Sequence, residues 1–406
     1  MTVGTTGFVG ERLTEAREGL GLTKVALSEL IDVSSMAISQ YEAGPQTPRA
    51  DVLDRICDKL GYPRSFFLRP PVAEDSEPIF WRSNAGATKI ARQRALQRLR
   101  WLKETTDYLL TYFDLPSVDI PSFDVTESNF RDLSSDQIEK FAEESRLAWN
   151  FGTGPVPDLI LELENNGAIT ARINMGAETL DAFSQWCGRL GIPFVILGKD
   201  RASAARSRFD AAHELGHLVL HRKIDRRRVN SKEDWKILEQ QAHRFAAAFL
   251  FPSKSFSDEL WAPTLDSFLS LKERWKVSIK MMIMRAKHAG IIDQFDAQRL
   301  YINYNRRGWN TDEPLYAVLK HEAPRIVQRS IAALIQEGIR SKQQILDDLA
   351  LPAREIEELS AMEKGYFSTS RSEIKAFPTL KESAKTHQNQ GTAEVVQLFG
   401  RKEKGD

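Results

Sequence analysis

The stretch Phe209-Asp-Ala-Ala-His-Glu-Leu-Gly-His-Leu-Val-Leu-His221 decides how the centre of the chain folds. His213 and His217 are four residues apart, so on a helix both imidazoles lie on one face and can bind one zinc ion. Glu214 projects beside them, where its carboxylate can accept a proton from a water that zinc activates. Because the flanking residues are apolar, two imidazoles without partners would be costly there. The stretch therefore predicts a buried zinc-binding helix.

A catalytic zinc site needs a third protein ligand and keeps its fourth position for water. Glu239 is the expected third ligand, on a second helix with a core stripe of Leu238, Ala242, Phe245 and Phe249. His243, one turn later, is the competing ligand. His221 is expected to be a helix C-terminal cation or an outer partner of the site. The oxyanion donor stays open among Tyr301, Tyr304 and His288.

These two motifs together carry a family resemblance. Arg206–His221 and the pattern Glu239-x-x-Ala-x-x-Phe-Ala resemble the ImmA/IrrE family of metallopeptidases, over roughly Ala148–Gly290. The resemblance implies that His213, His217 and Glu239 bind zinc. It also implies that Glu214 is the general base of peptide-bond hydrolysis.

A second pattern lies near the N-terminus, where Thr23 and Ser34 are predicted helix caps on either side of a short turn. Two helices must meet there at an angle, with an expected shared core of Val25, Ala26, Leu30, Val33, Ala37, Ile38 and Tyr41. Short polar side chains at the start of the second helix suit the major groove of DNA. The expected DNA-contacting residues are Lys24, Ser34, Ser35, Met36, Ser39 and Gln40.

Residues Gly10–Phe67 resemble the XRE (lambda-repressor-like) helix-turn-helix family, which implies a double-stranded DNA operator as partner. This module has seven Lys/Arg against nine Asp/Glu, so a monomer should bind DNA modestly. A homodimer, or the basic amphipathic helix predicted over Arg82–Lys103, would compensate. The alternatives are that this helix is a solvated face packed on its neighbours, and that the N-terminal module only contacts proteins.

Length, charge and cysteine content limit the number of domains and the kinds of partner that we expect. The chain has 406 residues and zero formal net charge, so several domains are expected and no overall basic field indicates nucleic acid. Two distant cysteines, Cys57 and Cys187, argue against a disulfide framework and favour a reducing compartment. Without a secretory signal or an apolar run long enough to cross a bilayer, we expect a cytoplasmic protein with no membrane partner.

The predicted fold class is mainly α with an α+β domain: a five-helix lambda-repressor-like domain, a zincin-like metallopeptidase domain with a small sheet, and a C-terminal helical region. Strands are expected at 167–173 and 193–197, and helices at 138–149, 157–165, 180–190 and, interrupted, from 209 to 290. Three further helices are expected within 321–359. The expected divisions are residues 10–68, a linker and basic helix at 69–134, then 135–295, 296–367 and a flexible tail at 368–406.

The joined resemblances imply a DNA-binding regulator with a zinc-dependent endopeptidase domain. Its expected substrate is a repressor, an antitoxin or the chain itself, in a stress, phage or mobile-element response. The alternative is a transcription factor or antitoxin whose peptidase-like domain senses a ligand without turnover. Glu214 favours the first hypothesis slightly, because a purely structural zinc site does not require that carboxylate.

Overall fold

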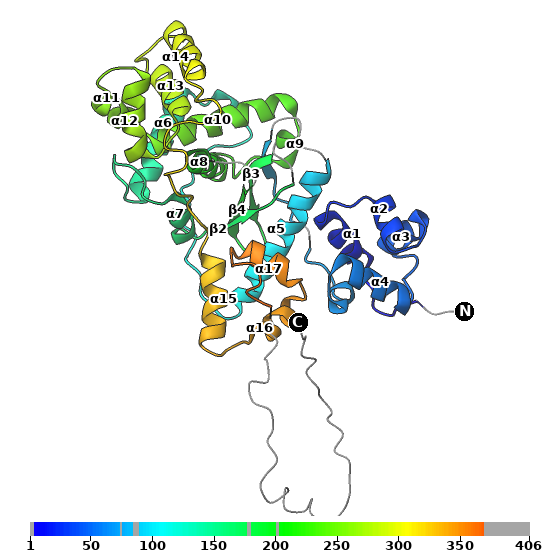
Figure 1. The fold of residues 1–406 in the computed structure, drawn as a ribbon. Helices are drawn as coiled ribbons and strands as arrows, with labels where there is room; N and C mark the ends of the chain where they lie inside the picture. The colour runs from blue at the N-terminus through cyan, green and yellow to red at the C-terminus, as the bar shows by residue number, and fades with distance from the viewer. Residues whose placement is uncertain (1–3, 74, 84–88, 177–179, 200–202, 369–406) are drawn as a thin grey trace, which may run out of the picture. The chain divides into compact units, whose positions relative to one another are not determined.

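The computed structural model describes residues 4–73, 75–83, 89–176, 180–199 and 203–368. In these ranges the chain is mainly helical with one four-stranded sheet, which confirms the predicted fold class (Figure 1). The tail predicted at 368–406 lies, apart from Ser368, outside the described residues.

Five short helices form the N-terminal domain, as predicted: α1 (Gly10–Gly19), α2 (Lys24–Leu30), α3 (Ser35–Ala43), α4 (Ala50–Leu60) and the 3-10 helix η1 (Arg64–Leu68). The side chains of Thr23 and Ser34 accept hydrogen bonds from the backbone N–H groups of Ala26 and Ala37, both at 3.1 Å. They satisfy donors that each helix start leaves without an intrahelical partner. The two caps therefore fix the turn between α2 and α3.

The predicted core of α2 was wrong in register. Val25 is 56% exposed and Leu30 is 41% exposed, whereas Leu27 and Ile31 are buried; Ile38 of α3 is buried as predicted. Leu27 and Ile31 are four residues apart and so share one helix face. The sequence pattern did not resolve this, because apolar residues occur on both faces of this seven-residue helix.

The sheet has the strand order β1-β3-β4-β2, with β1 (Ile79–Ser83), β2 (Ile169–Ile173), β3 (Leu180–Cys187) and β4 (Ile192–Gly198). β3 is antiparallel to both β1 and β4, and β2 is parallel to β4. The helix predicted at 180–190 is strand β3. Nearly every side chain of β3 is buried because both sheet faces are covered, and such a run lacks the alternation that marks a half-exposed strand.

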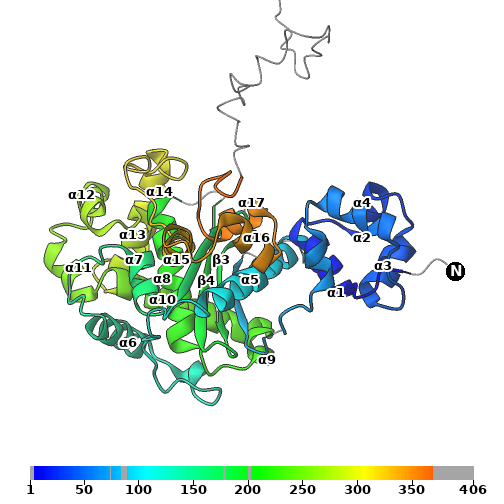
Figure 2. The ribbon, with the colours of Figure 1, turned by 90° about the horizontal axis from the view of Figure 1, so that it is seen from below.

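The two faces of the sheet pack into different cores. Ala182, Trp186 and Val195 belong to the core formed with α8 (Ala204–Leu220) and α10 (Lys232–Leu250). Their neighbours Phe183 and Phe194 belong to the core formed with α5 (Lys89–Leu110) and the N-terminal domain. The sheet thus separates the zinc-motif helices from α5 (Figure 2).

The other helices complete these cores. They are the 3-10 helix η2 (Phe130–Asp132), α6 (Ser135–Ala148), α7 (Leu159–Asn165), α9 (Arg226–Val229), α11 (Ser253–Glu259), α12 (Leu265–Trp275), α13 (Ile279–His288), α14 (Gln294–Arg306), α15 (Ile326–Gln336), α16 (Lys342–Leu349) and α17 (Ala353–Leu359). The last three correspond to the helices predicted within 321–359. The first of them begins later than the predicted residue 321, after Pro324, because the residue before a proline avoids the helical region.

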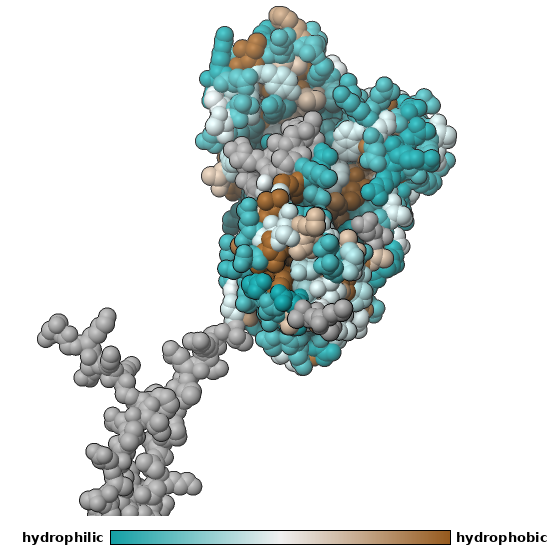
Figure 3. All heavy atoms as spheres, turned by 90° about the vertical axis from the view of Figure 1, so that its right-hand side faces the viewer, coloured by the Kyte–Doolittle hydropathy of each residue, from teal (hydrophilic) through white to brown (hydrophobic). Residues whose placement is uncertain are grey.

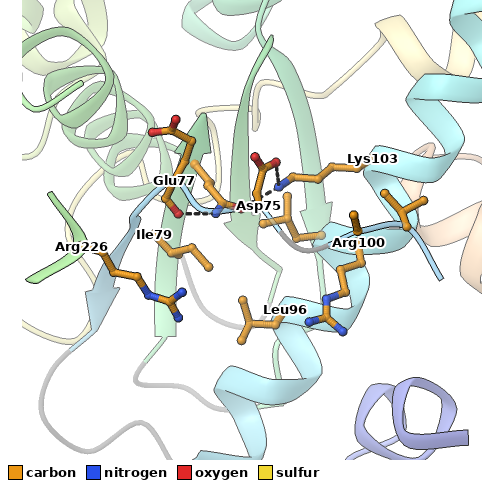
Figure 4. A pocket seen from close by; sticks show the side chains of 11 residues that line it. Asp75, Glu77, Ile79, Leu96, Arg100, Lys103 and Arg226 are labelled. Atoms are coloured by element: carbon orange, nitrogen blue, oxygen red, sulfur yellow. Dashed lines mark hydrogen bonds and ion pairs between the residues drawn. The ribbon is translucent and has the colours of Figure 1, made fainter. Parts of the chain in front are cut away.

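Helix α5 connects the N-terminal domain to the sheet. Trp101 is fully buried, with its ring 5.8 Å from that of Tyr62, and a Cβ on Gly19 would come within 2.2 Å of its indole. Lys103 pairs with Asp75 at 2.9 Å and with Gln185 of β3 at 2.7 Å (Figure 4). The charge of Lys103 is thus used for contacts inside the protein, whereas Lys89 is exposed. The helix begins at Lys89, and Arg82 of the predicted range lies in β1.

Candidate metal centre

The helices α8 and α10 carry the zinc motif and lie unusually close together. A Cβ on Gly216 would come 3.2 Å from the Cα and the carbonyl oxygen of Ala242 and 3.2 Å from the ring of Phe245. Gly216 precedes His217, so the contact brings the second histidine of the motif next to α10. The side chains of Ser203 and Ser231 cap the two helices at their starts.

Three side chains converge where these helices meet. Nε2 of His217 lies 3.1 Å from Nε2 of His213 and 3.0 Å from Oε1 of Glu239, and the remaining separation, His213 to Glu239, is 3.3 Å. Ligands bound tetrahedrally to zinc at 2.0 to 2.1 Å would be about 3.3 Å apart. Among the described residues, His213, His217 and Glu239 form a cluster that could hold a metal ion. Both the spacing and the donor set fit zinc.

The outer partners of His217 fix which of its nitrogens carries a proton. Nε2 of Gln241 donates to the carbonyl oxygen of Phe130 at 2.5 Å, so the side-chain oxygen of Gln241 faces His221. That oxygen only accepts, and therefore Nε2 of His221, 3.0 Å away, carries a proton. Burial lowers the pKa of His221 to about 3, with a smaller contribution from His217, so its Nδ1 is an acceptor.

Nδ1 of His217 lies 2.9 Å from Nδ1 of His221 and must donate to it. In a neutral imidazole this leaves Nε2 of His217 with a lone pair, directed at Glu239. Burial would raise the pKa of Glu239, but the two imidazoles beside its carboxylate lower it below its ordinary range. One proton could bridge two of the three converging atoms, whereas one metal ion would contact all three. The hydrogen-bond chain therefore prepares His217 as a metal ligand.

Aromatic rings hold His217 in place. The ring of Phe80 in β1 stacks on it at 4.6 Å, and the ring of Trp235 in α10 lies parallel at 6.1 Å. His213, Glu214 and His217 are fully buried, and the side chain of Glu239 is 21% exposed. Of the three clustered residues, Glu239 is thus the one that reaches solvent.

Glu214 is oriented from the sheet. Oγ of Ser184, in β3, donates to its Oε2 at 2.6 Å, and both side chains are buried. The sequence interpretation missed Ser184 because it assigned this segment to a helix. It missed Gln241, Phe80 and Trp235 as well, since none of them belongs to a spaced motif.

Comparison with known families identifies matches for two parts of the chain, the metal-cluster region and the N-terminal helices. Residues 164–287 match the model of peptidase family M78, described as an IrrE N-terminal-like domain, and residues 13–67 match a helix-turn-helix model, HTH_3. The chain joins an XRE-type helix-turn-helix domain to an IrrE-like peptidase domain. No curated protein matches the chain.

None of the remaining candidate histidines and tyrosines of the sequence analysis belongs to the metal cluster found among the described residues. His243 is exposed, with its ring 4.8 Å from that of His213, and it is not in the metal cluster of the IrrE-like domain. Tyr304 donates to Glu313 at 2.7 Å, and Tyr301 donates to the Lys280 carbonyl at 3.4 Å. Burial and nearby arginines lower the pKa of His288 to about 4. None of these contacts identifies an oxyanion donor.

The pocket drawn in Figure 4 is separate from the metal cluster. Its volume is about 90 Å³, and its lining includes Asp75, Ile79, Arg100, Lys103 and Arg226, but no member of the cluster. It lies between the segment leading into β1 and helix α5.

The helix-turn-helix domain exposes the start of α3. Met36 is 70% exposed and Ser35 is exposed, while Ser39 and Gln40 are half-buried. Nζ of Lys24 lies 3.2 Å from Glu42 and 3.4 Å from Oγ of Ser39, so its charge is partly neutralised. Apolar brown spheres lie between teal ones on the side that carries this domain (Figure 3).

No helix among the described residues is long and apolar enough to span a membrane.

Proposed function

We propose that this protein is a DNA-binding transcriptional regulator whose IrrE-like domain is a zinc-dependent endopeptidase. The observation that carries the metal assignment is the convergence of Nε2 of His213, Nε2 of His217 and Oε1 of Glu239 within 3.0 to 3.3 Å, with the chain His221–Gln241–Phe130 behind His217. Packing alone does not require two imidazole nitrogens and a carboxylate oxygen to converge there. A cation at that point satisfies all three.

In this proposal His213, His217 and Glu239 hold the zinc ion and Glu214 is the general base. When bound, zinc supplies Lewis-acid chemistry that activates water and polarises a peptide carbonyl. Glu214 accepts the proton, and the hydrogen bond from Ser184 keeps its carboxylate in one orientation. Burial of Glu214 removes competing solvent, which strengthens its interaction with the reacting groups.

The proposed partner of the helix-turn-helix domain is a double-stranded DNA operator. The proposed contacts are Lys24, Ser34, Ser35, Met36, Ser39 and Gln40, with Met36 best exposed for a thymine methyl. The side chain of Ser34 also caps α3 and so positions the first turn of that helix. Binding as a homodimer would double the contacts of a module that carries little positive charge.

The proposed substrate is a repressor, an antitoxin or this chain, cleaved in a stress, phage or mobile-element response. A second candidate is a sensor that binds metal or ligand without turnover. Helix α5 favours it, because it packs on both the helix-turn-helix domain and the sheet, and so could transmit a change in one to the other.

The variant Glu214→Gln separates the two candidates. It keeps the side-chain shape and the metal ligands but removes the base, so zinc content should stay the same while cleavage stops. The measurements are zinc per chain by mass spectrometry, cleavage of a peptide library, and operator-dependent transcription. If transcriptional control is unchanged in Glu214→Gln while wild type cleaves peptides, hydrolysis is not the regulatory step. If wild type carries no zinc, the metal assignment fails.

A further inference from the structure

The segment that joins the two metal helices is strongly basic. Residues 222–236 read Arg-Lys-Ile-Asp-Arg-Arg-Arg-Val-Asn-Ser-Lys-Glu-Asp-Trp-Lys, with seven Lys/Arg against three Asp/Glu in a chain of zero net charge. We call it the basic segment. It begins two residues after α8 ends and reaches into the second turn of α10.

Two of the three acids in the basic segment are used internally. Asp225 caps α9 and pairs with Arg227 at 3.0 Å. Asp234 is buried and pairs with Arg131 at 2.5 Å and with Arg228 at 3.5 Å. In contrast, the side chains that face solvent include Arg222, Arg226, Lys232 and Lys236. The acids are shared with Arg227 and Arg228, Lys223 pairs with Asp124 at 3.2 Å, and Glu233 is exposed, so the positive charge of this surface comes mainly from those four side chains.

Part of this charge is aligned with the metal centre. Lys232, Lys236, Glu239 and His243 follow each other at helical spacing along one face of α10. At 1.5 Å per residue, Lys236 and Lys232 precede Glu239 by about 4.5 Å and about 10.5 Å along the helix. Glu239 is the partly exposed ligand of the cluster, so the centre opens towards this stripe.

Trp235, inside the segment, lies on the metal side, because its ring is stacked 6.1 Å from that of His217. Arg226 of α9 instead lies beside Ile79 of β1 (Figure 4), on the sheet face opposite to Phe80, which stacks on His217. The part of the basic segment that borders the cluster is therefore the part on α10.

We propose that the basic segment binds an acidic stretch of the polypeptide substrate next to the scissile bond. This proposal rests on the proposed peptidase function and specifies its substrate class. An extended peptide advances about 3.4 Å per residue. Lys236 and Lys232 therefore correspond to substrate positions about one to three residues from the bond that is cut.

A polypeptide fits better than duplex DNA because the stripe ends at a centre whose residues suit amide hydrolysis. Cations along one face of a helix attract an anionic ligand from solution and favour one direction of binding. The bound zinc ion, held by one carboxylate and two neutral imidazoles, would add to this positive potential.

The test measures binding without turnover. Full-length, zinc-loaded Glu214→Gln protein is titrated into three fluorescent probes: a decapeptide with four Glu residues, the same peptide with four Lys residues, and a 20-base-pair duplex. A second protein adds Lys232→Glu and Lys236→Glu. A matched control instead adds Lys140→Glu and Arg299→Glu, two cations that are 71% and 70% exposed on other helices.

The acidic peptide should bind at least about tenfold more tightly than the basic one, and the charge reversal should abolish this preference, because the two lysines supply the charges that select between the peptides. Added salt should weaken the binding, and the control variant should keep it. Equal affinity for both peptides, or an unchanged preference after reversal, would overturn the proposal. So would a loss confined to the duplex, which would make the segment a DNA contact.

A parallel assay keeps the two proposals distinguishable. Wild-type protein is incubated with the same peptides and products are detected by mass spectrometry. Acid-selective binding without any cleavage would support the binding surface and contradict the peptidase function. Cleavage without a preference for the acidic peptide would support the peptidase function and contradict the binding surface.

Discussion

Helix α5 and the helix pair α8–α10 both bury polar side chains, yet they use them in opposite ways. Along α5 the partners diverge: Glu104 pairs with Arg12 of α1 at 2.7 Å, Arg98 with Glu355 of α17 at 3.4 Å, and Lys103 with Asp75. In α8–α10 the polar atoms converge on one point. Divergent contacts hold elements together, whereas convergent acceptors create a site for a cation. The direction in which the buried polar groups point, rather than their number, distinguishes contacts that hold helices together from a site that can bind a metal ion.

Removing a converging group should have the largest effect. His217→Ala leaves two ligands for the proposed zinc ion, so affinity should fall by more than about 1,000-fold, beyond the 10- to 100-fold typical of outer partners. His243→Ala is the matched control, because that histidine lies beside the cluster and not in it. Zinc per chain after dialysis distinguishes them. Loss of zinc in His243→Ala with retention in Glu239→Ala would reverse the third-ligand assignment.

Truncating the centre of α5 should destabilise the fold without affecting zinc. Trp101 is fully buried against Tyr62 and Phe66, and Trp101→Ala should cost about 3 to 5 kcal/mol of unfolding free energy. Trp261, which is 78% exposed, is the control, and Trp261→Ala should change stability by less than about 0.5 kcal/mol. Denaturant unfolding measures both. Equal effects of the two substitutions would contradict the proposed role of α5.

Breaking the hydrogen-bond chain behind His217 should have an intermediate effect. His221→Phe keeps the ring volume but removes the acceptor that fixes His217, so zinc affinity should fall about 10- to 100-fold. His288→Phe alters another histidine with a lowered pKa, away from the cluster, and should leave affinity unchanged. Competition with a chromophoric chelator gives both constants. An unaltered affinity in His221→Phe would show that the chain does not prepare the ligand.

The last expected effect is a pH dependence of the stability of the metal-free protein. The pKa of His221 is about 3 in the fold, below its ordinary 6.5, so the unfolded chain binds the proton more readily between these values. Stability from this group is complete above pH 6.5 and is lost as pH falls towards 3. Urea unfolding in chelator from pH 7 to pH 4 should show a weaker decline for His221→Phe than for wild type. Parallel declines would contradict the buried neutral state.

The sequence predicted the convergent region better than the divergent one. The spacing of His213 and His217 fixes a shared helix face whatever surrounds it, and the structure places Glu239 with them. For α5 the same reasoning found an amphipathic helix but not its partners, which lie up to hundreds of residues away. In β3 it failed, because a strand buried on both faces shows no alternation.

The sequence by itself determined the features that depend on neighbouring residues alone. These are the histidine pair on one helix face, the caps of α2 and α3, and the mainly helical class. Tertiary structure alone decided what depends on distant neighbours. Packing buries Leu27 and Ile31 on one face of α2 and brings Ser184 into hydrogen-bond contact with Glu214. It also aligns Gln241 and the Phe130 carbonyl behind His217. Helix periodicity is a property of consecutive residues, whereas burial and hydrogen-bond direction arise only when separate segments pack.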